Sequence, residues 1–114
     1  MMEALYVEYS TEPNTDAYNF LKELSFVVIG NLKNYEFPSP LYATPVIFNS
    51  DSPTPFIVFV GKSDDLDIVI QEIENFIHDS GKTLPTFQVL RKKGSSKEYI
   101  ENLLHNPEMS FDLI

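Results

Sequence analysis

The run of residues 44–66 constrains the fold of this chain more than any other part of its sequence. Residues 44–49 and 55–61 are short apolar segments of the kind that form β-strands. The proline-rich and serine-rich residues between them are typical of a turn. The sequence therefore predicts a strand, a turn, a second strand and then a helix, with Pro45 at the start of the first strand.

The helix after this predicted hairpin has the clearest pattern in the chain. Between Leu66 and Ile77 the apolar side chains recur every three or four residues, so they share one helical face. We expect Ser63 to cap the helix and Asp64 to oppose the positive end of its dipole. Gly81 is the expected C-terminal stop.

Four further elements are expected outside this run. One is a helix that Asn14 or Thr15 caps and whose apolar face consists of Ala17, Phe20, Leu21 and Leu24. Residues 4–10 and 86–90 have the composition of strands. Ser95 and Glu98 have the spacing of a capping box, which predicts a short helix that ends before Pro107. The apolar tail, residues 109–114, is expected to pack on the core or to insert into a partner.

Residues 25–30 have two interpretations, and these lead to two architectures. If residues 15–33 form one helix, the element order is βαββαβ with a terminal helix, which is ferredoxin-like. If residues 25–30 form a buried strand that Gly30 ends, the order is βαβ followed by ββα and a C-terminal helical tail, which is thioredoxin-like. The β-branched composition of residues 25–30 favours the strand slightly.

The length of 114 residues is typical of a single domain. We expect an acidic α/β core at residues 1–81, with a basic loop, a short helix and the apolar tail of residues 82–114 packed on the same domain. The absence of cysteine excludes disulfides and thiolate chemistry, and it favours the cytoplasm. The apolar runs are too short to span a membrane.

Charge is distributed unevenly along the chain. Residues 1–81 hold 13 Asp and Glu against 3 Lys, a net of −10, whereas residues 82–114 hold 4 against 5 Lys and Arg, a net of +1. An acidic body repels the phosphate backbone, so direct nucleic-acid binding is not expected. A basic protein partner is favoured instead.

The thioredoxin-like order resembles the N-terminal half of glutathione transferases and the related metaxin-type domains. Three local features carry the resemblance: a first strand that runs into a loop and a helix, Thr44–Pro45 before an apolar strand, and Ser63–Asp64 at the start of the following helix. In that family the proline is cis and its neighbours hold glutathione. The resemblance therefore implies a ligand site that comprises Tyr9, Ser10, Thr44, Pro45, Ser63 and Asp64.

A second candidate site follows from the residues themselves. The basic residues Arg91, Lys92, Lys93 and Lys97 precede or begin the last predicted helix, where an anion or an acidic partner is favoured. We expect no metal site, because helix capping accounts for the aspartates at residues 64–67. The two histidines, at positions 78 and 105, are expected on the surface, and no cofactor motif is present.

These observations predict a protein-interaction or adaptor module without catalysis of its own. One alternative is an acidic inhibitor that occupies the basic site of a nucleic-acid-handling protein. The other is a glutathione-type ligand binder. A second copy of the same chain is also among the candidate partners.

Overall fold

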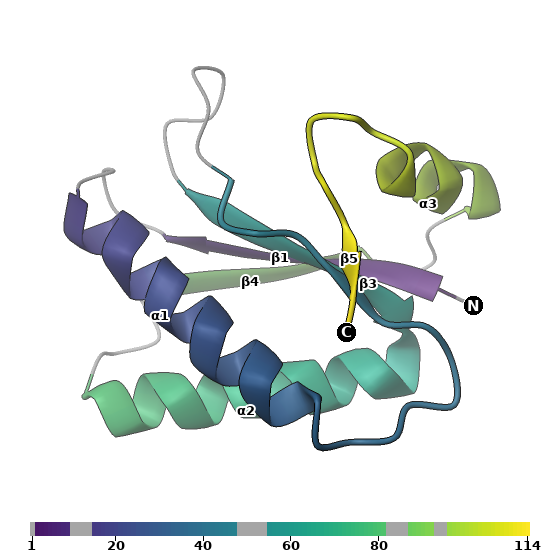
Figure 1. Cartoon of the computed structure of the whole chain (residues 1–114). Coiled ribbons are helices and arrows are strands. Elements are labelled where there is room, and N and C mark those ends of the chain that lie inside the picture. The colour runs from purple at the N-terminus through teal and green to yellow at the C-terminus, as the bar shows by residue number, and fades with distance from the viewer. Residues whose placement is uncertain (1, 10–14, 48–54, 82–86, 93–95) are drawn as a thin grey trace.

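An antiparallel β-sheet forms the middle of the molecule (Figure 1). The computed structural model describes residues 2–9, 15–47, 55–81, 87–92 and 96–114, and these residues contain five strands in the spatial order β4-β1-β3-β2-β5. All adjacent strands are antiparallel. The strands are β1 (Met2–Tyr9), β2 (Tyr42–Ala43), β3 (Phe56–Lys62), β4 (Phe87–Lys92) and β5 (Asp112–Leu113).

Helices cover both faces of this sheet, but unequally. The long helices α1 (Thr15–Leu32) and α2 (Ser63–Ser80) lie on one face, and the short helix α3 (Lys97–Leu104) lies on the other (Figure 1). Because side chains alternate along a strand, Leu5 of β1 packs in the layer of the long helices, whereas Ala4 packs beneath α3. Among the described residues, no helix is long and apolar enough to cross a membrane.

The larger hydrophobic core lies between the sheet and the two long helices. Its buried side chains come from every third or fourth position of each helix and from alternate positions of the central strands, as amphipathic elements require. They are Leu5, Val7, Leu21, Leu24, Val28, Leu32, Leu41, Ala43, Ile57, Phe59, Leu66, Val69, Ile73 and Ile77.

The order of elements is that of the ferredoxin-like alternative, βαββαβ, followed by α3 and β5. The thioredoxin-like order is not the one that the structure shows, because it requires a strand at residues 25–30. That strand prediction was wrong. Residues 25–30 lie inside α1.

Packing explains why these β-branched residues are helical. Leu21, Leu24, Val28 and Leu32 are fully buried and lie on one side of α1, facing the sheet and α2. A strand at residues 25–30 would place alternate side chains on opposite faces and would break this continuous apolar stripe. Burial of the stripe overrides the local β propensity, which spans only about 1 kcal/mol.

The structure around Pro45 differs from two predictions: that a strand begins at this proline, and that its peptide bond is cis. The regular strand β2 comes before the proline and pairs with β3 as far as Ala43 and Phe59. The next pairing joins Ile47 to Phe56. Between these two pairings, residues 44–46 lie opposite only residues 57 and 58. Three residues against two form a β-bulge, a place where proline is tolerated in a sheet. The Thr44–Pro45 peptide is trans, since the described residues contain no cis peptide bond. The expected cis-proline was therefore wrong.

The helix ends agree with the sequence only in part. The N-cap of α2 is Lys62, without a side-chain cap, so the capping role expected for Ser63 was wrong. Gly81 ends α2 in the left-handed conformation, at φ 76°, as predicted. Ser96 caps α3 by accepting a hydrogen bond from the backbone N–H of Tyr99, while Ser95 lies outside the described residues.

The C-terminal third of the chain completes the sheet at both edges. Strand β4 continues through Arg91 and Lys92, which the sequence had placed in a loop, and it pairs with β1. The apolar tail packs on the domain, since β5 pairs with β2 and Ile114 contacts the main core. The backbone N–H of Ile114 donates to the carbonyl of Leu41 at 2.9 Å.

Candidate functional site

The residues expected to hold a glutathione-type ligand are not brought together. Tyr9 ends β1 beside the first residue of β3, whereas Ser63–Asp64 opens α2 directly after the last residue of β3. Strand β3 has seven residues, so about 20 Å separates these two ends. Thr44–Pro45 lies beside the middle of β3, and Ser10 lies outside the described residues.

The described residues of the expected basic site belong to two successive elements. Arg91 and Lys92 belong to β4, while Lys97 is the first residue of α3. The Lys97 ammonium is exposed and lies 3.9 Å from the carboxylate of Glu101, one turn further along the same helix. Lys93 lies outside the described residues.

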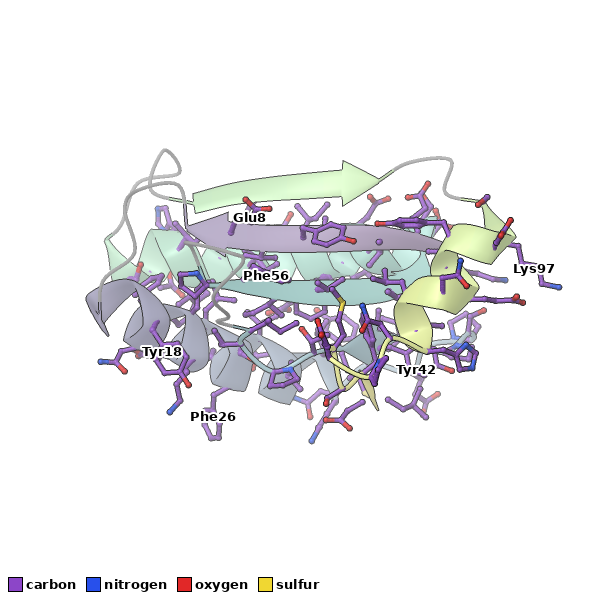
Figure 2. All side chains as sticks on the ribbon, turned by 90° about the horizontal axis from the view of Figure 1, so that it is seen from above. Glu8, Tyr18, Phe26, Tyr42, Phe56 and Lys97 are labelled. Carbon is purple, nitrogen blue, oxygen red and sulfur yellow. The ribbon has the colours of Figure 1, made fainter. Side chains whose placement is uncertain are left out.

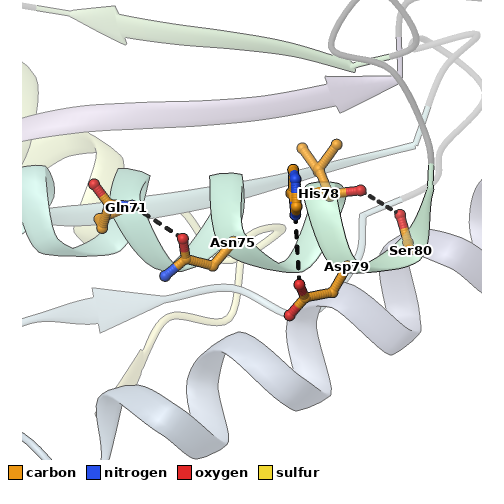
Figure 3. Close-up of polar contacts among 6 residues, drawn as sticks. Gln71, Asn75, His78, Asp79 and Ser80 are labelled. Carbon is orange, nitrogen blue, oxygen red and sulfur yellow. Dashed lines mark hydrogen bonds and ion pairs between the residues drawn. The ribbon is translucent and has the colours of Figure 1, made fainter.

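The two histidines lie on the surface, as expected. On the outer face of α2, the Nδ1 atom of His78 is 3.6 Å from the carboxylate of Asp79 (Figure 3). The Nδ1 atom of His105 is 2.8 Å from the carbonyl oxygen of Glu101, near the end of α3. Among the described residues, no group of three or more His, Asp or Glu side chains is arranged to hold a metal ion.

A carboxylate is buried at the start of α2. Asp65 is 5% exposed, and its Oδ2 atom has no hydrogen-bond partner. It lies in the first turn of the helix, where the dipole favours negative charge. The helix end thus accounts for the position of this charge.

On the α3 side of the sheet, two tyrosines form a polar contact over an apolar cluster. The hydroxyl oxygens of Tyr6 and Tyr99 are 2.6 Å apart. Burial of the Tyr6 ring, together with this hydrogen bond and the nearby Tyr99 and Glu8, raises the pKa of the Tyr6 hydroxyl far above its usual value. A hydroxyl of this kind stays protonated at neutral pH and is not a base.

Among the described residues, a groove runs along a flank of α1. It consists of two adjoining hollows of about 190 and 290 Å³ that share Ser25 and Pro45. One wall is α1, and the other is the bulge after β2 together with the end of the chain. We call this the α1 groove. Its lining residues are Tyr18, Lys22, Ser25, Phe26, Ile29, Lys33, Ala43, Thr44, Pro45, Val46, Asp112, Leu113 and Ile114.

The wall formed by α1 and by Lys33, the residue that follows it, is a stripe, which we call the outer stripe. Its six residues all lie within about 100° around the helix axis at 3.6 residues per turn. The stripe is next to the buried face of α1 and extends away from the core. Its members are Tyr18, Lys22, Ser25, Phe26, Ile29 and Lys33.

Phe26 is the most exposed large apolar side chain among the described residues. Its side chain is 82% exposed, and it points away from the sheet on the same side of α1 as Tyr18 (Figure 2). The opposite wall is also partly apolar, with Leu113 65% exposed and Pro45 exposed at the bulge. The groove therefore offers apolar surface on both walls.

The charge of the α1 groove is opposite to that of the body around it. Two of the three lysines of residues 1–81, Lys22 and Lys33, line it, and the outer stripe contains no carboxylate. Asp112 on the opposite wall is the single acidic lining residue among those described. The Lys22 ammonium lies 5.4 Å from the centre of the Tyr18 ring, a cation–π contact that holds it along the groove.

The size of the hollows favours side chains over a small-molecule ligand. Pockets that enclose a small molecule have volumes of about 300–1,000 Å³. Each hollow of the α1 groove taken alone, at about 190 or 290 Å³, is smaller than this range, and both hollows are open at the surface. They match the apolar anchors of a protein surface more closely than a glutathione-sized ligand.

The sequence interpretation did not identify the α1 groove. Its residues come from three separated parts of the chain, and only the fold joins them. One signal was present: on a helix that spans residues 15–33, Phe26 falls outside the apolar stripe. A large aromatic residue on the polar side of a helix is a candidate contact residue.

No family model, curated protein or solved structure matches this chain.

Proposed function

We propose that this chain is a protein-interaction module, without catalysis of its own, that binds a partner through the α1 groove. The observation that carries the proposal is the exposure of Phe26, 82%, among the residues that line an apolar hollow. Aromatic side chains in such positions are the usual anchors of protein interfaces.

The energetics of this position support the proposal. Full burial of a side chain of this size contributes about 1.5–3 kcal/mol. Phe26 gains little of this in the isolated domain, because the core of α1 lies on the other side of the helix. When a partner covers the groove, the burial of Phe26 and of the exposed Leu113 side chain would contribute to the free energy of binding.

The acidic-inhibitor alternative has a separate observation in its favour. The outer face of α2 exposes Asp64, Asp67 and Glu74, and residues 1–81 have a net charge of −10. A basic partner would bind this face, with an affinity that falls steeply as salt is raised. Insensitivity of the complex to salt would remove this alternative.

A cytoplasmic location remains part of the proposal, based on the cysteine-free composition.

Affinity capture from the source cell with quantitative mass spectrometry tests the α1 groove. The full chain is compared with Phe26→Ala and with Tyr35→Ala, which removes an aromatic ring that is 44% exposed and lies outside the groove. Circular dichroism first verifies that both variants are folded. We expect a protein that is captured by the parent chain and by Tyr35→Ala and is depleted at least tenfold by Phe26→Ala.

Equal depletion by both variants, or no effect of Phe26→Ala, would contradict the proposal. Tyr35→Ala also removes a hydrogen bond of 2.8 Å from the Tyr35 hydroxyl to Glu72. The Tyr35→Ala substitution therefore removes a contact between two parts of the domain, whereas the groove is unchanged. This makes Tyr35→Ala a stringent control for effects on stability. Survival of the complex in Tyr35→Ala therefore separates a groove effect from a stability effect.

A further inference from the structure

We propose that the partner segment in the α1 groove is acidic: an extended peptide with carboxylates at two places and an apolar residue between them. This inference rests on the proposed function. It names a partner chemistry that the overall charge of the chain, −9, would not predict.

The spacing of the two lysines defines the length of the segment. Lys22 lies in α1, and Lys33 directly follows its last residue, with its N–H still bonded to the carbonyl of Ile29 at 3.1 Å. Eleven residues at helical spacing correspond to about 16 Å along the axis and about 20° around it. An extended chain covers 16 Å in about five residues. Phe26 lies between the two lysines on the same stripe and faces the middle of such a segment.

Both ammonium groups are available for this role. Within the described part of the chain, neither Lys22 nor Lys33 is in an ion pair, in contrast to Lys97 with Glu101. The outer stripe has no carboxylate of its own. At physiological ionic strength the Debye length is about 8 Å, so a bound segment interacts mainly with the two lysines at the groove.

A basic segment fits the same groove poorly. It would place like charges at both ends, and Asp112 is the single acidic side chain among the described lining residues. A second copy of this chain also fits poorly, because each copy has a net charge of −9. The local charge thus favours an acidic partner over both of these occupants.

An NMR titration of the ¹⁵N-labelled full chain tests the inference. The probe is a blocked seven-residue peptide with two glutamates at each end, a central phenylalanine and serine in the two remaining positions. One control peptide has lysine in place of glutamate, and the other has alanine in place of phenylalanine. We expect the first peptide to shift the amide signals of residues 18–33 and the two controls to bind at least threefold more weakly.

Single charge reversals identify the lysines that act. We expect Lys22→Glu and Lys33→Glu each to weaken the acidic peptide about two- to fivefold, the effect of an exposed ion pair. Lys62→Glu is the matched control, since it changes the net charge equally and Lys62 lies at the start of α2, outside the groove. It should leave the affinity unchanged.

Three results would overturn the inference: equal or tighter binding of the lysine peptide, an equal effect of Lys62→Glu, or no binding of the acidic peptide at millimolar concentration. A dimer that dissociates in Phe26→Ala, seen by sedimentation, would also overturn it. If the acidic peptide fails while Phe26→Ala still loses the captured protein, the groove binds a partner of different chemistry. If both fail, the proposed function fails as well.

Discussion

Thr44 and Val58 are joined by two hydrogen bonds, and the side chain of Thr44 makes one of them. The backbone N–H of Thr44 donates to the carbonyl of Val58 at 2.9 Å. In return, the backbone N–H of Val58 donates to the hydroxyl oxygen of Thr44 at 3.0 Å. A hydroxyl thus takes the place of a backbone carbonyl at the point where the chain enters the bulge at Pro45.

This relationship predicts a large effect of removing one oxygen atom. Thr44 and Val58 are both buried, so the N–H of Val58 has no access to solvent. In Thr44→Val the side chain keeps its shape but loses the acceptor, which should cost about 1–3 kcal/mol in the free energy of unfolding. Urea denaturation of the variant measures this cost.

Thr44→Ser is the matched control for this prediction. It keeps the hydroxyl and removes one methyl group, so we expect a loss of about 0.8 kcal/mol. A smaller loss in Thr44→Val than in Thr44→Ser would show that packing, and not the hydrogen bond, gives Thr44 its role.

The hydrogen bond of Thr44 is also an example of a feature that sequence patterns do not predict. The apolar pattern correctly located two strands near residues 42–62, but it put the first strand after Pro45 instead of before it. A side chain that replaces a backbone carbonyl leaves no periodic signal. Strand β5, with only two residues, is likewise too short to produce a pattern.

The tyrosine pair Tyr6–Tyr99 predicts a loss of stability at alkaline pH. The pKa of the Tyr6 hydroxyl is raised, first by burial and then by the hydrogen bond to Tyr99. A raised pKa in the folded state means that stability is fully present below the unfolded value, about 10, and falls as the pH rises above it. We therefore expect the free energy of unfolding to decrease above about pH 10.

Tyr6→Phe tests this expectation, because phenylalanine cannot ionise. At pH 8 the variant should lose about 0.5–1.5 kcal/mol with the hydrogen bond, while its stability should vary less between pH 9.5 and 11.5 than that of the parent chain. Chemical denaturation across this range measures both effects. An unchanged pH dependence in Tyr6→Phe would show that other groups cause the alkaline loss.

Two glycines predict alanine effects of opposite sign. Gly81 has a φ of +76°, where an added Cβ is strained, and Gly30 lies inside α1 with no atom within 4 Å of the added Cβ. Gly81→Ala should therefore lower stability by about 1 kcal/mol. Gly30→Ala should raise it by about 0.5–1 kcal/mol, because alanine is the better helix former. Thermal denaturation of both variants compares the signs, and a stabilising Gly81→Ala would contradict the cap geometry.

Helix α1 shows what local propensity cannot decide. Its valines and isoleucine slightly favoured a strand at residues 25–30, whereas packing against α2 favours the helix. The ring of Phe20 lies 5.4 Å from that of Phe76 on α2, and the side-chain amide of Asn31 donates to Glu72 at 3.2 Å. These contacts join residues more than forty positions apart, so they become visible only in the fold.

The α1 groove likewise could not be predicted from the sequence, because it depends on contacts between distant parts of the chain. The bulge at Pro45 and the end of the chain come beside α1 only when β2 and β5 pair. The six residues expected from the glutathione-transferase resemblance, in contrast, were chosen by local likeness alone. With α1 helical throughout, the five described residues of this set are spread along the length of the sheet.

Site-specific photo-crosslinking tests the central claim most directly. A photoreactive phenylalanine analogue replaces Phe26 in the groove or, in a matched variant, Glu74 on the outer face of α2, and the cells are irradiated. The account predicts a covalent adduct with a single partner protein from position 26 and none from position 74. An adduct from position 74 alone, or none from either position, would contradict a docking role for the α1 groove.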